Sequence, residues 1–453
     1  MGGARVGLLQ SPFNVPLDAG KDAAVVNTWT RAVVRGAQAR RLLQGRIKGL
    51  APADVEALAK QRFLVADPEV ERLSHEHWFL QRKFQPPLVT VNVAVHDGSA
   101  KRARLDVSAR AGVARLIEQA ASESASPAAT LRLVGGEPFE VSAESLDLVE
   151  RAREAVAGAR VPLSVTITTG GVPTRSRAAR RLVQAADTFE LELGGARGSA
   201  RARRPVAPTG DPDAAALRAI AYLAGLGKTI VLTLEHGSRP LARRTAARIL
   251  GDVYRALGKT AYGRLRFRLG SCRGEGCPRW GPDGWPQRPH AKTHGDDAML
   301  RELLADSPFA DCHEGGAGGA TVLPPALEQS GDLDLCSYLR GCAFHVAASG
   351  DVLLCPVLPL SVGRVTREAR LGLRRLRVTN ADPFDDGECR ACAFVPLCVG
   401  RCPVDARGAP RWRDEGCRAQ ARAALASWVA HAEPPAAGDQ ATPRPVFAVE
   451  GRG

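Results

Sequence analysis

"LVTVNVAV", residues 88 to 95, is the first of six short apolar runs that decide the fold. The other five are "TLRLV" (130 to 134), "LSVTITT" (163 to 169), "TFELEL" (188 to 193), "TIVLTLE" (229 to 235) and "RLRFRL" (264 to 269). Each has the length of a strand and is followed by a turn and an amphipathic stretch of helix length. The runs start about 25 to 42 residues apart, which fits a strand, a crossover helix and a returning strand. Six such units predict an α/β fold, a parallel sheet with outer helices curled into a partial (β/α)6 barrel over residues 85 to 330.

The segment before the barrel, residues 1 to 84, is predicted to be a small α+β module. Within it, "APADVEALAKQRFLVAD" has helical apolar spacing at Val55, Leu58 and Phe63. Pro52 stands where the first turn of this helix would begin, a position that proline favours.

Two further segments follow the barrel. Residues 331 to 432 are rich in cysteine and are expected to form a separate domain, closed by a helix in "RAQARAALASWVAHA". Residues 433 to 453 consist largely of Pro, Ala and Gly, a composition typical of a disordered tail.

Bulk properties narrow the function classes. The chain has no apolar stretch long enough to cross a bilayer and no signal-peptide core at its start, so a cytoplasmic protein without a membrane partner is expected. Its net charge is +14, yet only eight of its 62 basic residues are lysine, and it has just 22 Phe, Trp and Tyr. Nucleic-acid binding is therefore disfavoured, and an acidic protein or peptide is the better partner.

Eight of the eleven cysteines lie between residues 336 and 417. Cys389 and Cys392 are separated by two residues, a spacing at which two thiolates reach one metal centre. Disulfides are disfavoured by the expected compartment. Eight thiols divide evenly into two four-thiolate sites, which suit either two structural zinc ions or two iron-sulfur clusters.

The cysteine spacing resembles that of the SPASM domain, the carboxy-terminal module of radical S-adenosylmethionine (SAM) enzymes that mature peptides and sulfatases. The match covers about 80 residues and includes every cysteine of the pattern. The resemblance implies two auxiliary 4Fe-4S clusters. One would be held by the residues at the positions of Cys336, Cys342, Cys355 and Cys402, and the other by Cys389, Cys392, Cys398 and Cys417.

A second motif of radical SAM enzymes follows the second predicted strand. There the sequence reads GGEP, formed by Gly135, Gly136, Glu137 and Pro138. In the family this turn holds the amino group of the cofactor's methionine moiety, because two glycines let the backbone approach a ligand and its carbonyls accept from an ammonium. The resemblance implies a SAM-binding turn, and whether SAM still binds here as a structural ligand stays open.

The chain departs from the family after the first strand. Family members carry three cysteines there, spaced CxxxCxxC, that bind three irons of the catalytic cluster. This sequence places Asp97, Lys101 and Arg104 roughly at those positions, and none is a thiolate. Without these ligands a cluster with an open iron cannot form in the usual way, so we expect a degenerate barrel that does not cleave SAM.

Three other cysteines could in principle replace the missing ligands. Cys272, Cys277 and Cys312 lie in the Gly- and Pro-rich region after the sixth strand. Their spacing matches no known cluster site, and loop thiols are the favoured interpretation.

Three hypotheses follow. The first is an iron-sulfur protein of peptide modification, a pseudoenzyme that binds a precursor peptide, relays electrons or partners an active radical SAM homologue. Residues 1 to 84, which resemble the winged-helix-like leader modules of peptide-maturing members, would then contact the peptide. The second is an active peptide maturase with an unconventional catalytic cluster, and the third is a zinc-stapled scaffold.

Overall fold

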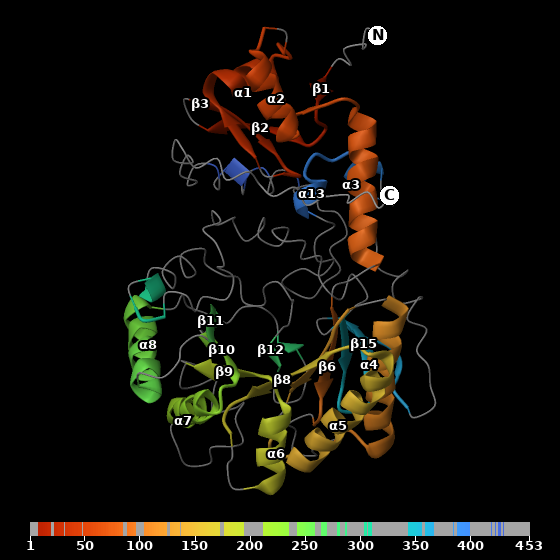
Figure 1. Cartoon of the computed structure of the whole chain (residues 1–453), viewed down its shortest axis with the longest axis vertical. Coiled ribbons are helices and arrows are strands. Elements are labelled where there is room, and N and C mark those ends of the chain that lie inside the picture. The colour runs from red at the N-terminus through yellow and green to blue at the C-terminus, as the bar shows by residue number, and fades with distance from the viewer. Residues whose placement is uncertain are drawn as a thin grey trace.

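The computed structural model of the whole chain is drawn in Figure 1. The residues it describes are 8–19, 22–30, 32–47, 49–84, 88–96, 104–124, 127–135, 137–172, 176–193, 212–234, 242–258, 264–269, 279–280, 286–287, 303–305, 307–309, 343–355, 358–366, 384, 387–398, 418, 422, 425, 426 and 429.

The main sheet contains all six predicted strands, each within one residue of its predicted ends. They are β6 (Val89–Ala94), β7 (Ala129–Val134), β8 (Leu163–Thr169), β9 (Thr188–Leu193), β10 (Thr229–Leu234) and β11 (Leu265–Leu269). All neighbouring pairs are parallel, and the strands follow one another in chain order. The predicted α/β class and parallel sheet are therefore confirmed.

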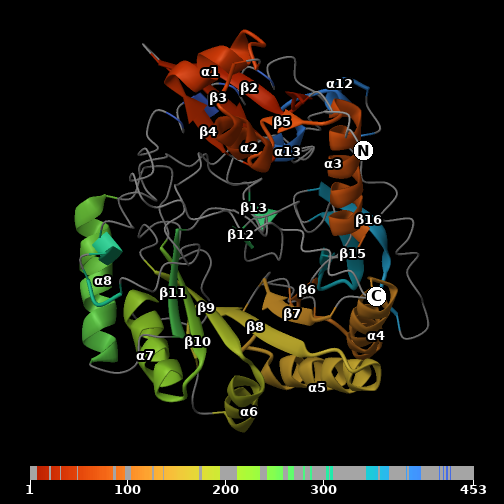
Figure 2. The same ribbon diagram turned by 45° about the horizontal axis from the view of Figure 1, so that its top comes forward.

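Five helices alternate with these strands: α4 (Val107–Ser124), α5 (Ser142–Ala159), α6 (Arg177–Ala185), α7 (Pro212–Gly225) and α8 (Arg243–Leu257). Helix α4 packs on α5, α5 on α6, and α7 on α8, and Figure 2 shows these helices along the outside of the sheet. Their buried apolar side chains form one core with alternate residues of the strands. Sequential strands covered by helices in this way match barrel-type winding. The curvature of a partial barrel stays a prediction.

Three strands from the cysteine-rich segment extend the same sheet. They are β14 (Ala343–Val346), which is parallel to β6, followed by β15 (Asp351–Cys355) and β16 (Leu358–Arg364), which are antiparallel. Gly350 makes the turn between β14 and β15 at a φ of +87°, a conformation that favours glycine. The first part of the segment predicted as a separate domain thus continues the sheet at β6.

The amino-terminal residues form a small sheet flanked by helices. Strands β2 (Asn14–Ala19), β3 (Asp22–Asn27) and β4 (Val33–Arg35) are antiparallel, and β1 (Leu9–Gln10) pairs with β5 (Leu64–Val65). Helices α1 (Gly36–Leu43) and α2 (Pro52–Lys60) pack with this sheet in a second core, and the predicted proline at the start of α2 is confirmed. We call residues 8 to 65 the amino-terminal module.

Helix α3 (Pro68–Phe84) runs from the amino-terminal module toward the main sheet (Figures 1 and 2). A further short hairpin consists of β12 (Arg279–Trp280) and β13 (Pro286–Gln287). In the parts of the chain that the structure describes, no helix combines the length and apolar character needed to cross a membrane.

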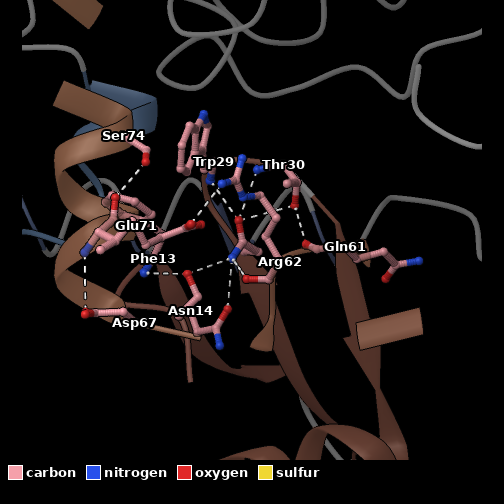
Figure 3. A network of polar contacts seen from close by, with 12 residues as sticks. Phe13, Asn14, Trp29, Thr30, Gln61, Arg62, Asp67, Glu71 and Ser74 are labelled. Atoms are coloured by element: carbon pink, nitrogen blue, oxygen red, sulfur yellow. Dashed lines mark hydrogen bonds and ion pairs between the residues drawn. The ribbon is translucent and has the colours of Figure 1, made fainter. Parts of the chain in front are cut away.

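A polar network fixes the amino-terminal module at its centre. The amide of Asn27, which is fully buried, donates to the Arg62 carbonyl at 2.7 Å, and its oxygen accepts from the Trp29 and Thr30 amides at 3.1 and 3.0 Å. Figure 3 shows Arg62 beside Trp29 and Glu71. The Arg62 guanidinium lies 4.0 Å from the Trp29 ring centroid and 2.9 Å from a Glu71 carboxylate oxygen. Arg62 therefore connects the turn after β3 to helix α3.

Candidate functional site

Glu137 joins the carboxyl ends of β7 and β8, the edge at which barrels of this type bind ligands. Its carboxylate accepts hydrogen bonds from the Thr169 hydroxyl at 2.8 Å and from the backbone N–H groups of Gly170 and Phe139, at 2.9 and 3.2 Å. The side chain is buried. The carboxylate of the GGEP turn therefore serves to fasten two strand ends together.

Burial raises the pKa of Glu137 to about 7, while the hydrogen bonds from Gly170, Thr169 and Phe139 act in the opposite direction. Desolvation outweighs these bonds because the carboxyl lies entirely inside the protein. A carboxyl with such a pKa exchanges its proton near neutral pH.

His96 lies two residues after the end of β6 and contacts the same turn. Its Nε2 atom accepts the backbone N–H of Glu137 at 2.7 Å and lies 3.0 Å from the carbonyl oxygen of Glu137. The first contact needs a lone pair on Nε2 and the second needs a proton there, so each belongs to a different tautomer of the ring. His96 is buried. It contacts the N–H and carbonyl groups of Glu137, in the turn that the resemblance to radical SAM enzymes predicts to bind the methionine moiety of SAM.

The GGEP residues are only partly within the described chain. Gly135 directly follows β7 and has a φ of +72°, so the turn needs a glycine there. The Pro138 carbonyl accepts from the Ser145 hydroxyl at 2.8 Å. Gly136 lies outside the described residues. The role of this turn in binding SAM stays a prediction.

The loop after β6 contains the three positions at which the sequence departs from the radical SAM motif that it resembles. Asp97 and Lys101 lie outside the described residues. The Arg104 guanidinium forms an ion pair with Glu144 at 2.8 Å. The backbone of Arg104 forms an isolated antiparallel β-bridge with His96, and the Leu105 N–H donates to the Val95 carbonyl at 2.9 Å. No cysteine occurs between β6 and α4.

A buried ion pair lies on the sheet face opposite the helices. Leu131, Leu133 and Phe189 belong to the helix-covered core, so the alternating positions Arg132 and Glu190 face the other way. Nη2 of Arg132 lies 2.6 Å from Oε1 of Glu190.

Glu190 also accepts the Thr168 hydroxyl at 2.9 Å. At the register of Asn92, the strand β14 adds His345, whose pKa burial lowers to about 3. Sequence reasoning missed this polar face. The signal was the alternation of polar and apolar residues in "TLRLV" and "TFELEL".

Cys389 and Cys392 are the two predicted metal ligands whose side chains are described. Cys389 lies in α12 (Gly387–Arg390), and Cys392 lies in the turn between α12 and α13 (Val395–Cys398). The Cys392 N–H donates to the Cys389 carbonyl at 3.0 Å. Both are half-buried thiols. The CxxC spacing of two thiols suits a four-thiolate zinc or iron-sulfur site, so the residues present fit either group.

The remaining predicted ligands have no described side chains. Cys355 ends β15 and Cys398 ends α13, each as backbone only. Cys336, Cys342, Cys402 and Cys417 lie outside the described residues, as do Cys272, Cys277 and Cys312. Within the described chain no three His, Cys, Asp or Glu side chains come together as a metal site. The grouping of the eight cysteines into two clusters stays a prediction.

The fold and the site define an α/β protein in which a cysteine-bearing carboxyl-terminal segment extends the parallel sheet and reaches the amino-terminal module. No protein-family profile and no curated protein matches the sequence.

Solved structures give distant matches. SuiB from Streptococcus suis is 14% identical with a TM-score of 0.43, covering 90% of this chain and 98% of that one. The protein anSMEcpe, solved with bound AdoMet, is 15% identical with a TM-score of 0.48, covering 76% and 97%. An HMG-CoA lyase from Brucella melitensis is 17% identical with a TM-score of 0.32, covering 64% and 95%. None of these TM-scores reaches 0.5, so they do not establish the family of the chain.

Proposed function

We propose that this chain is an iron-sulfur protein related to radical SAM peptide maturases that does not cleave SAM. Its eight carboxyl-terminal cysteines hold two 4Fe-4S clusters, which supply electron transfer when they are present. It acts in peptide modification by binding a precursor peptide or by partnering an active homologue.

The loop after β6 is the observation that carries this proposal. A cluster with an open iron needs three thiolates near the strand ends, and the stretch from β6 to α4 contains none. His96 and Arg104 flank the loop instead, His96 bound to the Glu137 backbone and Arg104 to Glu144. Glu137 still connects the ends of β7 and β8, whereas the three thiolates that radical chemistry needs are absent from the stretch between β6 and α4.

The amino-terminal module limits how a peptide could bind. One face of its sheet packs on α1 and α2, and the other packs on residues of the cysteine-bearing segment. Within the described residues, β2 and β4 are the edge strands of this three-stranded sheet, where an added strand could pair. A peptide would then bind by extending the sheet, and the net charge of +14 favours an acidic one.

Purification without oxygen tests the proposal. Two clusters give a brown protein with broad visible absorption and about eight irons per chain, given four irons per cluster. A colourless protein with about two zinc ions per chain would instead support the zinc scaffold. A protein with neither metal contradicts both.

A further inference from the structure

The amino-terminal module and the turn that carries Cys389 and Cys392 share one hydrophobic core, although about 360 residues separate them in sequence. The module contributes residues of strands β2 and β3 to this core. The other side comes from the turn after Cys392 and from helical residues near the carboxyl end. The buried members are Val15, Leu17, Ala24, Val26, Phe394, Leu425 and Val429, with Cys392 and Ala393 packed against them.

Hydrogen bonds cross the same interface. The Thr28 hydroxyl donates to the carbonyl of Ala393, the residue directly after Cys392, and Thr28 is 1% exposed. Arg35 donates to the Val429 carbonyl at 2.6 Å, and Arg422 donates to the Pro16 carbonyl at 3.0 Å. The module is thus hydrogen-bonded to the backbone of the cysteine turn through Thr28, and to the helical residues near the carboxyl end through Arg35 and Pro16.

Helix α3 contacts the same turn from a second side. Glu76 pairs with Arg390, which lies between the two cysteines, at 2.7 Å. Phe384, five residues before Cys389, lies 5.0 Å from Phe79 and 5.8 Å from His75, measured between ring centroids. His75 is fully buried, and burial lowers its pKa to about 3, so it packs as a neutral aromatic ring.

We propose that docking of the amino-terminal module and binding of a metal group at Cys389 and Cys392 are thermodynamically linked, with Thr28 as a positioning residue. A thiolate-bound group fixes the turn, and the fixed turn supplies the surface on which β2–β3 pack. Because linkage is reciprocal, whatever loosens the module weakens retention of the group by the same factor. The inference rests on the proposed function for the identity of the group, and on the described contacts for the coupling.

The first test compares Thr28→Val with Thr30→Val. Both remove a hydroxyl from the same turn. The Thr28 hydroxyl contacts the Phe13 carbonyl of the module at 3.2 Å as well as the Ala393 carbonyl across the interface. The Thr30 hydroxyl donates to the Gln61 carbonyl at 3.0 Å and to the Asn27 side-chain oxygen at 3.2 Å, both within the module. With the anaerobic, metal-loaded full-length protein, the visible absorption is followed after addition of an iron chelator. Thr28→Val is expected to bleach about fivefold faster than wild type, the equivalent of one hydrogen bond worth about 1 kcal/mol. Thr30→Val is expected to bleach at the wild-type rate, and equal rates for the two variants would overturn the role of Thr28.

The second test works in the reverse direction and needs no metal assay. Amide hydrogen exchange of residues 14 to 27 is measured in Cys389→Ser/Cys392→Ser and in the control Cys272→Ser/Cys277→Ser. The first pair is expected to lose protection at β2–β3, and the control pair is expected to keep it. Unchanged protection in both pairs refutes the linkage.

Failure of the linkage can be told apart from failure of the proposed function. If the protein carries zinc, the exchange result is still expected, because any group that fixes the turn has the same effect, and zinc release replaces the bleaching assay. If it carries no metal, the proposed function fails. The linkage then fails with it, because no bound group is left to be coupled to docking of the module.

Discussion

Arg132 on β7 reaches past β8 to Glu190 on β9, where Nη2 lies 2.6 Å from Oε1 and the two side chains are 7% and 13% exposed. A charge pair this well buried is costly to break, because removing one partner leaves the other charge inside the protein. The pair connects strands that are not adjacent, so it fixes β7, β8 and β9 relative to one another on the sheet face opposite the helices.

Replacing Arg132 alone is expected to destabilise the protein strongly. Arg132→Met leaves the Glu190 charge buried and should lower the free energy of unfolding by about 3–5 kcal/mol. The double variant Arg132→Met/Glu190→Gln should recover most of this loss, since no buried charge is then left without its partner. Urea denaturation measures both changes.

The exposed pair of Arg181 and Glu150 is the matched control. Its side chains are 56% and 48% exposed, and Arg181→Ala should cost less than about 1 kcal/mol. A loss of equal size in Arg132→Met and Arg181→Ala would show that the buried pair has no special role.

Glu137 predicts a pH dependence of stability. Burial raises its pKa from 4.5 to about 7, so the folded protein binds this proton more tightly than the unfolded chain does. The resulting contribution is fully present below the unfolded pKa of 4.5 and is lost as the pH rises through about 7.

Glu137→Gln removes this dependence, because the amide does not ionise. Denaturation at pH 5 and at pH 8 should show the variant gaining on wild type at the higher pH, by up to about 3 kcal/mol. A stability difference that is the same at both pH values would contradict the raised pKa of this carboxyl.

Helix α4 lies close to the backbone just after β16, and Gly112 is the residue at this contact. A Cβ atom built at Gly112 would lie 2.8 Å from the backbone nitrogen and oxygen of Thr366, which no real structure tolerates without movement. Gly112→Ala should destabilise the protein by about 1–3 kcal/mol, as overpacking does. Gly158 in α5 has nothing within 4 Å, so Gly158→Ala should be neutral or stabilising by up to about 1 kcal/mol. Thermal unfolding of the two variants distinguishes the positions, and equal shifts would contradict the contact.

Replacing Asn27 is expected to destabilise the amino-terminal module locally. Its amide binds the Arg62 carbonyl and the Trp29 and Thr30 N–H groups, all from inside the module. Asn27→Ala leaves these groups without a partner and should cost about 2–4 kcal/mol, given about 1–3 kcal/mol for each buried group left unsatisfied. Hydrogen exchange should accelerate in residues 22 to 35 and stay unchanged in α5. Uniform acceleration would mean that the network is not local to the module.

Local patterns in the sequence predict the elements of this fold well. All six strands of the predicted series are present, because their apolar runs have a clear length and are punctuated by turns. The start of α2 at Pro52 follows from the preference of proline for a first helical turn.

Contacts between distant segments could not be predicted in the same way. Nothing local in "AFHV", residues 343 to 346, says that it pairs with β6 about 250 residues earlier. The bond from His96 to Glu137 and the contact of Thr28 with Ala393 likewise depend on which loops meet in space. A single sequence carries no signal for such pairings beyond a polar residue at the end of a strand.

Cleavage of SAM tests the central claim most directly. The anaerobic, iron-loaded protein is incubated with SAM and a strong reductant, and 5′-deoxyadenosine is measured, with the electron paramagnetic resonance signal recorded before and after SAM is added. Because no thiolate stands between β6 and α4, the expected result is no 5′-deoxyadenosine and a cluster signal that SAM does not change. Formation of 5′-deoxyadenosine together with a SAM-dependent signal would contradict the account and establish an active enzyme with an unconventional catalytic cluster.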